Sequence, residues 1–378
     1  MIARLWPFIL GNVALGIDAY VIAGLLPAMA DDLGSTTGVV GLGVTAFTGA
    51  YALAGPLLAG IAGREAGRGL GIALLVFTLG NLLTVAAPGI ALYLVARVIA
   101  GAAAGVYSPL ATAVAAASVP GESRGRALGL VLAGLATGTV FGVPLGLWLG
   151  QLTSWRVSIL VIAVVGVASL VGVVVRNTRG AALPNIDSPP AAARLRSLTR
   201  PTTLLTVLVT FFTGIASLGL YTYIAEVLAD TGLRDHQTLG IWVWGLGGAV
   251  GVLLIGRIVD RVRVSLRVTV VILLGLLVAL LILGTGPAVW LLVIVLAAWG
   301  ALGWASLAPQ QDTLLRANPT DGATAVAAES SANYLGSAVG SALGSVALVA
   351  GVGGTSLAFL AAIPVALALV VHLVRMRM

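Results

Sequence analysis

The stretch ALGIDAYVIAGLLP, residues 14–27, holds a single charged side chain, Asp18, in the middle of an apolar run from Leu5 to Ala30. A run of this length is enough for an α-helix to cross a bilayer, which takes ~20 residues. A carboxyl group inside such a helix is costly and usually functional, and burial favours its protonated form. We predict that Asp18 binds and releases a proton; the alternative is a hydrogen bond that holds two helices together.

The composition extends this conclusion to the whole chain. Of its 378 residues, 59% are hydrophobic and only 9% are charged, which is too little charge for the surface of a soluble protein. Cysteine is absent and there are two histidines, so we expect no metal centre and no other cofactor. The first apolar run is too long for a cleaved signal peptide. We expect a polytopic membrane protein.

Apolar segments separated by short polar breaks predict twelve membrane-spanning helices. The predicted spans are 5–30, 37–62, 69–88, 90–118, 127–151, 156–175, 202–229, 237–259, 267–286, 288–315, 322–351 and 354–374. A long, basic, proline-rich segment, 176–201, follows the sixth span and has the composition of a linker. The first and seventh spans end alike, in LLPAMADDLG and YIAEVLADTGL, which indicates an internal repeat. We predict an all-α transmembrane fold of two pseudo-symmetric six-helix bundles, 1–175 and 202–378.

The arginines predict the orientation. With a cytoplasmic N-terminus, only Arg156 and Arg234 fall in outer loops, and the remaining loop arginines fall on the inner side. The positive-inside rule then places both termini and the linker in the cytoplasm, and we expect a bacterial inner membrane. This distribution accounts for the net charge of +7 without a nucleic-acid partner.

Arg97, in LYLVARVIAGAAAG, is the only arginine placed well inside a predicted span. A guanidinium cannot lose its charge, so it must pair or face water, and Asp18 lies at a similar depth. Competition between Arg97 and a proton for Asp18 would form a switch; the alternative is a permanent structural ion pair.

Two polar clusters within predicted spans are candidates for substrate binding. YTYIAEVL in the seventh span combines an acid with tyrosines, which suits a cationic or amphipathic ligand, although the acid could instead reach the outer interface. ESSANYLGSAVGSALGS in the eleventh span opens with polar side chains that either line a cavity or bond between helices. The candidate residues are Tyr20, Tyr221, Tyr223, Glu226, Asn333 and Tyr334.

The stretch GLATGTVFGVPLGLWLG, residues 134–150, has glycine at every fourth position, including Gly138, Gly142 and Gly146. One helix face therefore lacks side chains, so that a partner helix can approach closely, and Pro144 permits bending. We predict that this face is a moving interface.

These motifs resemble those of the major facilitator superfamily, in the twelve-helix drug:proton antiporter group. GTVFGVPLG resembles the antiporter motif of that group, and RVIAGAAAG is similar to a motif whose arginine, here Arg97, is implicated in proton transfer. GIDAYVIAGLLPAMADDLG and TYIAEVL resemble signatures of the branch that contains chloramphenicol and arabinose efflux proteins. The resemblance covers essentially the whole chain.

One loop departs from the family pattern. The family's Asp-Arg-x-Gly-Arg core is GREAGR here, with Gly63 at the aspartate position, whereas GRIVDRVR after the eighth span keeps the acid. In the family the aspartate is thought to latch the cytoplasmic side, so that function would pass to Glu65 or to the second half. The retained motif positions are Arg64, Gly67, Arg68, Asp260 and Arg261.

The resemblance implies a proton-coupled exporter that works by alternating access about a midplane cavity. The sequence has no HExxH, GxSxG or P-loop motif, so we expect no enzyme activity. Few polar residues lie on the predicted cavity helices, which favours a lipophilic or amphipathic drug such as chloramphenicol, and hence multidrug efflux and antibiotic resistance. The alternative is a sugar, nucleoside or other metabolite exporter. We expect a monomer in the bilayer whose partners are protons and the small substrate.

Overall fold

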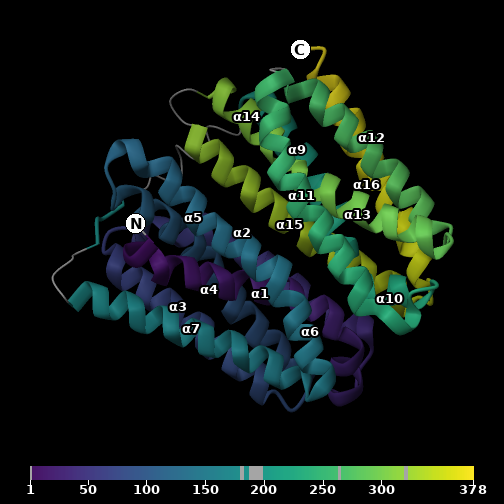
Figure 1. Ribbon diagram of the computed structural model, residues 1–378, viewed down its shortest axis with the longest axis horizontal. Coiled ribbons are helices and arrows are strands. Elements are labelled where there is room, and N and C mark those ends of the chain that lie inside the picture. Colours follow the sequence, from purple (N-terminus) through teal and green to yellow (C-terminus); the bar gives the residue numbers. More distant parts are fainter. Residues whose placement is uncertain (1, 179–182, 187–198, 263–264, 319–321) are drawn as a thin grey trace. The chain divides into compact units, whose positions relative to one another are not determined.

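The computed structural model describes residues 2–178, 183–186, 199–262, 265–318 and 322–378 (Figure 1). Within these ranges every regular element is a helix, and 12 helical stretches are long and apolar enough to cross a membrane. Both findings confirm the predicted all-α transmembrane fold. Most of the predicted linker 176–201 lies outside the described residues.

The described residues of 1–35 and 46–190 form one compact unit, and those of 36–45 and 191–378 form another. The first residues of the second helix therefore group with the second unit. The helices up to the linker are α1 (Ile2–Asp32), α2 (Thr37–Ala62), α3 (Ala66–Ala86), α4 (Ile90–Ala117), η1 (Gly121–Ser123), α5 (Arg124–Thr137), η2 (Gly138–Gly142), α6 (Val143–Leu152) and α7 (Trp155–Thr178). The bundle limits 1–175 and 202–378 stay a prediction.

In the first unit, the glycine-rich face of α5, η2 and α6 packs directly on α1. A Cβ at Gly134 or Gly138 would overlap the backbone carbonyl of α1, at Ile9 and Val13 respectively. Successive glycines up to Gly150 continue this contact along α1. The absence of side chains thus lets the two helices meet at their backbones, as the four-residue spacing predicts.

The centre of this helix pair departs from α geometry. Residues Gly138–Gly142 form a π-helical turn, η2, between α5 and α6. Pro144 follows it and has no N–H to bond the carbonyl four residues earlier, where its ring would also clash. A π-turn relieves both problems, and such turns are frequent at functional sites.

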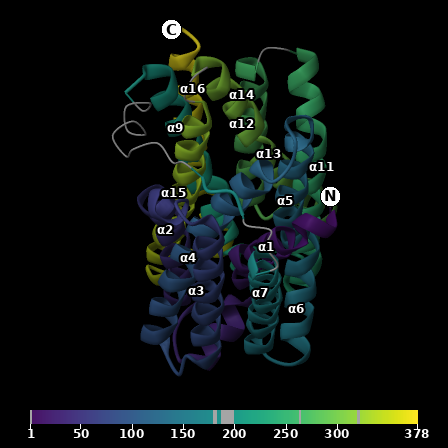
Figure 2. The same ribbon diagram turned by 90° about the vertical axis from the view of Figure 1, so that its left-hand side faces the viewer.

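The second unit repeats this design. After the linker its helices are α9 (Pro201–Gly214), η3 (Ile215–Gly219), α10 (Ile224–Ala229), η4 (Arg234–His236), α11 (Gln237–Val262), α12 (Ser265–Gly284), α13 (Val289–Ala305), α14 (Leu307–Ala317), α15 (Gly322–Val349) and α16 (Gly354–Arg375). A Cβ at Gly336 would overlap the carbonyl of Phe211, and one at Gly340 that of Ile215. The glycine face of α15 therefore packs on α9 and η3 (Figures 1 and 2). The first and seventh spans each receive a glycine-rich partner, which supports the internal repeat.

Two predicted spans are interrupted. The predicted helix 202–229 changes to π geometry at η3 and breaks at Thr222–Tyr223 before α10 begins. The predicted helix 288–315 breaks at Ser306, between α13 and α14. Pro309 explains the second break, because its ring excludes the carbonyl of Ala305 from the helical bond pattern.

Candidate functional site

The carboxyl group of Asp18 lies in the interior of the first unit. It is carried by α1, and Arg97 on α4 places its Nη1 2.7 Å from Asp18 Oδ1. Each residue is only 1% exposed. The structure thus brings together the two residues that the sequence nominated for proton coupling, as a buried ion pair.

Asn81 of α3 completes this cluster. Its Nδ2 donates to Asp18 Oδ2 at 3.1 Å and to the carbonyl of Phe77 at 3.2 Å. The guanidinium of Arg97 also lies over the ring of Phe47, 4.4 Å from the ring centroid. Among the described residues, Asn81 Oδ1 and Arg97 Nε find no hydrogen-bond partner although both are buried. The charges are matched, but the polar atoms around them are not all satisfied.

The sequence contains a weak signal for Asn81, an amide inside an apolar span, but no signal for Phe47. The pairing itself depends on the relative register of α1, α3 and α4. That register follows from tertiary packing, which one sequence does not reveal. Asn81 and Phe47 were therefore missed as members of the Asp18 cluster.

A second buried carboxyl group lies in the second unit. Glu329 of α15 is 0% exposed. Thr210 Oγ1 of α9 donates to Glu329 Oε1 at 3.1 Å, and Gln311 Nε2 of α14 donates to Glu329 Oε2 at 3.3 Å. Both partners are neutral, in contrast to the partner of Asp18.

A buried arginine bonds to the same two helices, α9 and α14. Arg375 of α16 is 4% exposed, and its Nη1 donates to Thr206 Oγ1 at 2.6 Å and to Gln310 Oε1 at 2.8 Å. Its Nη2 lies 2.7 Å from Nδ1 of His372, whose Nε2 lies 2.8 Å from the carbonyl of Leu266. Arg375 directly follows the predicted span 354–374 and was expected in an inner loop, so its burial was not predicted.

The tyrosines of YTYIAEVL have different surroundings. Tyr221 is buried and stacks on Trp244, with ring centroids 4.0 Å apart. Trp244 in turn contacts Trp299 and Trp304 edge-on, at 5.8 and 5.7 Å. Tyr223 is fully buried, and its hydroxyl donates to the carbonyl of Ser341 at 2.7 Å. Tyr221 therefore belongs to an aromatic cluster, whereas the hydroxyl of Tyr223 is engaged in helix packing.

The other substrate candidates are half-buried. Tyr20, Glu226, Asn333 and Tyr334 each expose an intermediate share of their surface. Asn333 lies against Gly214 in the α9–α15 contact, where a Cβ on the glycine would overlap its carbonyl. These positions are compatible with substrate contact, and their role stays a prediction.

In the loop after α2, Glu65 pairs with Arg68 at 2.6 Å on the surface, and Arg64 is exposed. A Cβ at Gly67 would lie 2.8 Å from the side-chain oxygen of Asn177 on α7. From the linker, Ile186 donates its N–H to the carbonyl of Gly63 at 3.0 Å. Glu65 is thus paired with Arg68 in this loop, and the linker contacts the same loop. That the latch function passes to Glu65 or to the second half stays a prediction.

In the second motif, Arg261 is exposed near the end of α11. The side chain of Asp260 lies outside the described part of the structure. The predicted latch role of both residues stays a prediction.

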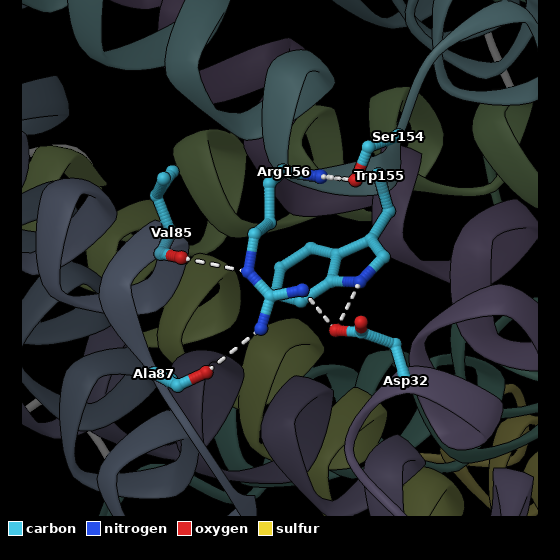
Figure 3. A network of polar contacts seen from close by, with 6 residues as sticks. All are labelled: Asp32, Val85, Ala87, Ser154, Trp155 and Arg156. Carbon is cyan, nitrogen blue, oxygen red and sulfur yellow. Dashed lines mark hydrogen bonds and ion pairs between the residues drawn. The ribbon is translucent and has the colours of Figure 1, made fainter.

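Figure 3 shows Arg156, one of the two arginines predicted to fall in outer loops, at the start of α7. Its Nη1 pairs with Asp32 at the end of α1, and Nε and Nη2 donate to the carbonyls of Val85 and Ala87, each at 3.0 Å. Trp155 Nε1 donates to the same Asp32 carboxylate at 3.0 Å, and the guanidinium lies over the Trp155 ring. This network ties the ends of α1, α3 and α7 together.

The sequence has relatives among bacterial membrane transporters. It is 28% identical to the inner membrane transport protein YdhP of Escherichia coli (strain K12) over 367 residues, which cover 95% of this chain and 92% of that protein. It is 29% identical to a chloramphenicol resistance protein of Streptomyces lividans over 253 residues, covering 66% of this chain and 64% of that one.

Solved structures show the same fold. The xylose transporter XylE from E. coli superposes with a TM-score of 0.74 at 16% identity, covering 97% of this chain and 95% of XylE. A mutant of the nucleoside transporter NupG gives a TM-score of 0.75 at 12% identity, covering 98% and 99%. Residues 8–328 match the sequence profile of the Major Facilitator Superfamily. With its twelve apolar spans and these relatives, the chain is a multi-pass membrane transporter, not an enzyme, and it belongs to the Major Facilitator Superfamily.

Proposed function

We propose that this transporter exports a small lipophilic or amphipathic compound in exchange for protons. The observation that carries this proposal is the buried cluster of Asp18, Arg97 and Asn81 on α1, α4 and α3. Asp18 is the acid in that cluster. Its position at mid-span gives the chain a group that can hold a proton within the membrane.

Protonation of Asp18 would remove the charge that holds Arg97. The neutral carboxyl then donates a proton where it previously only accepted, and it needs a new acceptor. Asn81 can supply one, because its unbonded Oδ1 lies on the amide that already contacts Asp18. The freed guanidinium stays over Phe47 and must find another partner. Proton binding therefore exchanges one buried bonding pattern for another.

The change in bonding around Asp18 would be transmitted to the rest of the first unit by movement of α1. Asp18 lies on the helix whose backbone contacts Gly134, Gly138 and the π-turn η2. A rearrangement of the ion pair can thus shift α1 along the glycine face of α5, η2 and α6, where few side chains oppose the movement. Coupling requires only that proton and substrate favour different facing states of the carrier. The arginine distribution supports a cytoplasmic position for both termini.

The substrate class is proposed from two features. One relative is named a chloramphenicol resistance protein. The second unit offers an aromatic cluster around Trp244 that includes the candidate Tyr221. Flat aromatic surfaces suit a lipophilic or amphipathic ligand better than a sugar, which needs several hydrogen-bonding groups.

The test is drug-driven proton movement in proteoliposomes, measured with a pH-sensitive dye. Wild-type protein should move protons when chloramphenicol or ethidium is added, and Asp18→Asn should abolish this signal. Asp31→Asn is the matched control, because Asp31 is an exposed acid at the end of the same helix. It should retain the wild-type signal.

Two results would contradict the proposal in different ways. Proton movement that survives in Asp18→Asn would show that Asp18 is structural. No proton movement with any drug in the wild-type protein would reject drug:proton exchange, and sugars and nucleosides would then be assayed.

A further inference from the structure

Glu329 is the buried acid that the Asp18 mechanism does not use. It lies about two turns into α15, in the stretch ESSANYLG, and its carboxyl group faces α9 and α14 through Thr210 and Gln311. An ionised carboxylate in such a place is costly unless it is paired. The contacts of Glu329 are hydrogen bonds to a hydroxyl and to an amide, and neither group carries a charge.

The chemistry of these partners differs from that of Arg97. A guanidinium only donates, so it stabilises an ionised carboxylate alone. A threonine hydroxyl donates or accepts, and the glutamine amide presents an oxygen when it is turned over. Thr210 and Gln311 can therefore bond Glu329 in both its protonated and its ionised form. The site accepts a proton without the loss of an ion pair.

The titratable groups on the surrounding helices leave this site unpaired. Neither α9 nor η3, which pack on α15, contains a titratable side chain. Helix α14 contributes Asp312 and Arg316, which pair with each other at 2.9 Å. The other neighbour, α16, contributes His372 and Arg375. On α15 itself the next titratable group is Tyr334.

Arg375 is bonded to the same two helices, α9 and α14, as Glu329. Thr206, which bonds Arg375, lies four residues before Thr210, or about 6 Å along α9. Gln310, which also bonds Arg375, is adjacent to Gln311 on α14. Each helix therefore carries one residue for the cation and one for the acid. Arg375 is thus a buried cation held by the same two helices, and its Nε has no hydrogen-bond partner among the described residues.

We propose that Glu329 is a second proton-binding site of the carrier, located in the second unit and independent of Asp18. Thr210 and Gln311 hold the carboxyl group in both protonation states. On the same two helices, Thr206 and Gln310 hold the buried cation Arg375. This inference rests on the proposed proton-coupled exchange for its role in transport, but the binding of the proton can be measured without transport.

The first test observes the carboxyl group directly. The chain has four glutamates, Glu65, Glu122, Glu226 and Glu329, so protein labelled with ¹³C at the glutamate carboxyl gives few signals. The labelled protein is titrated in lipid nanodiscs by NMR, and the signal lost in Glu329→Gln is assigned to Glu329. We expect that signal to report a neutral acid near neutral pH, where exposed glutamates are ionised. A Glu329 signal that titrates together with those of the exposed glutamates would overturn the proposal.

The second variant is Thr210→Val, which keeps the shape of the side chain and removes the hydroxyl. It should move the Glu329 titration and leave the other signals unchanged. An unchanged titration would show that the contact with Thr210 does not control the site. Elution as a single species in size-exclusion chromatography establishes that each variant is folded.

The role in transport is tested by the number of protons exchanged per drug molecule. Glu329→Gln should lower this ratio by about half, since one of two linked proton sites is lost. Glu122→Gln, an exposed acid in η1, is the matched control and should keep the wild-type ratio. An unchanged ratio in Glu329→Gln would reject the coupling role. Failure of the proposed function looks different, because then the wild-type protein itself moves no protons with drug while the NMR titration still reports on Glu329.

Discussion

The two units handle buried charge in opposite ways. In the first unit, Asp18 and Arg97 are in direct contact at 2.7 Å, so their opposite charges compensate each other. In the second, Glu329 and Arg375 are each bonded to neutral threonine and glutamine side chains. Both units nevertheless share a glycine-rich helix packed on their first membrane span. The helical frame repeats, whereas the electrostatics do not.

This difference bears on how each unit can respond to a proton. A proton that binds Asp18 competes with a guanidinium and changes the packing between α1 and α4. A proton that binds Glu329 displaces no cation and needs only that Thr210 or Gln311 turn to accept a hydrogen bond. The first unit is thus suited to convert protonation into movement, and the second to bind a proton with little structural change.

The largest expected effect comes from breaking the direct ion pair. Arg97→Met leaves Asp18 buried without a cation, which should destabilise the protein by roughly 3–5 kcal/mol. Thermal unfolding in detergent measures this loss.

The matched control for this prediction is the double variant Asp18→Asn with Arg97→Met. It removes both charges and should recover much of the lost stability. A double variant as unstable as Arg97→Met alone would show that packing, and not the uncompensated charge, causes the loss.

The shared glycine faces offer the next test. Gly138→Ala and Gly340→Ala each place a Cβ on a backbone carbonyl, at Val13 and Ile215, so both should cost about 1–3 kcal/mol. Gly129→Ala on α5 is the control, because a Cβ there meets no neighbouring atom within contact distance. It should be neutral or slightly stabilising.

This pair of variants also sharpens the comparison between units. If α1 slides on its glycine partner during exchange, Gly138→Ala should reduce the transport rate more than its stability loss explains. Equal transport in Gly138→Ala and Gly129→Ala would reject a moving interface at η2.

Removing the buried cation of the second unit, Arg375, should reduce stability less than removing Arg97. Arg375→Gln removes a buried cation, which relieves its desolvation, and it deprives Thr206 and Gln310 of one hydrogen bond each. We expect a loss of about 1–2 kcal/mol, smaller than that of Arg97→Met. Chemical unfolding of both variants in the same detergent measures the difference. An Arg375 variant as unstable as Arg97→Met would mean that Glu329 is ionised and depends on Arg375 directly.

The sequence predicts this protein unevenly, and the reasons are physical. Hydrophobic length alone places the spans, because a helix must be long enough to cross the bilayer. The four-residue glycine spacing predicts that another helix packs closely on α5, but it does not identify α1 as that helix. Asp18 and Arg97 are conspicuous because charges inside apolar runs are rare. The breaks at Thr222–Tyr223 and Ser306 were not anticipated, since apolar composition continues across them.

The remaining contacts depend on register between distant helices. Asn81 meets Asp18, and Gln311 meets Glu329, only after several helices have packed in a particular rotation. A polar residue inside a membrane span indicates that some hydrogen-bond partner must be present, but the sequence does not identify that partner. Arg375 is an example of the opposite kind. Its position at the end of a predicted span suggested exposure to solvent, whereas the packing of α9, α14 and α16 buries it.

The smallest expected effect is at the end of α1, where Asp32 and Arg156 form a partly exposed ion pair (Figure 3). Asp32→Asn removes the charge but keeps an oxygen that accepts from Trp155. Because exposed pairs contribute little, we expect a loss of about 0.2–1 kcal/mol that decreases further with added salt. Arg156→Met should cost more than Asp32→Asn, since the arginine also bonds the carbonyls of Val85 and Ala87. Unfolding measured at low and high ionic strength separates these contributions. A large, salt-independent loss in Asp32→Asn would show that the Asp32–Arg156 network, and not the buried pair of Asp18 and Arg97, is the main electrostatic contact of α1.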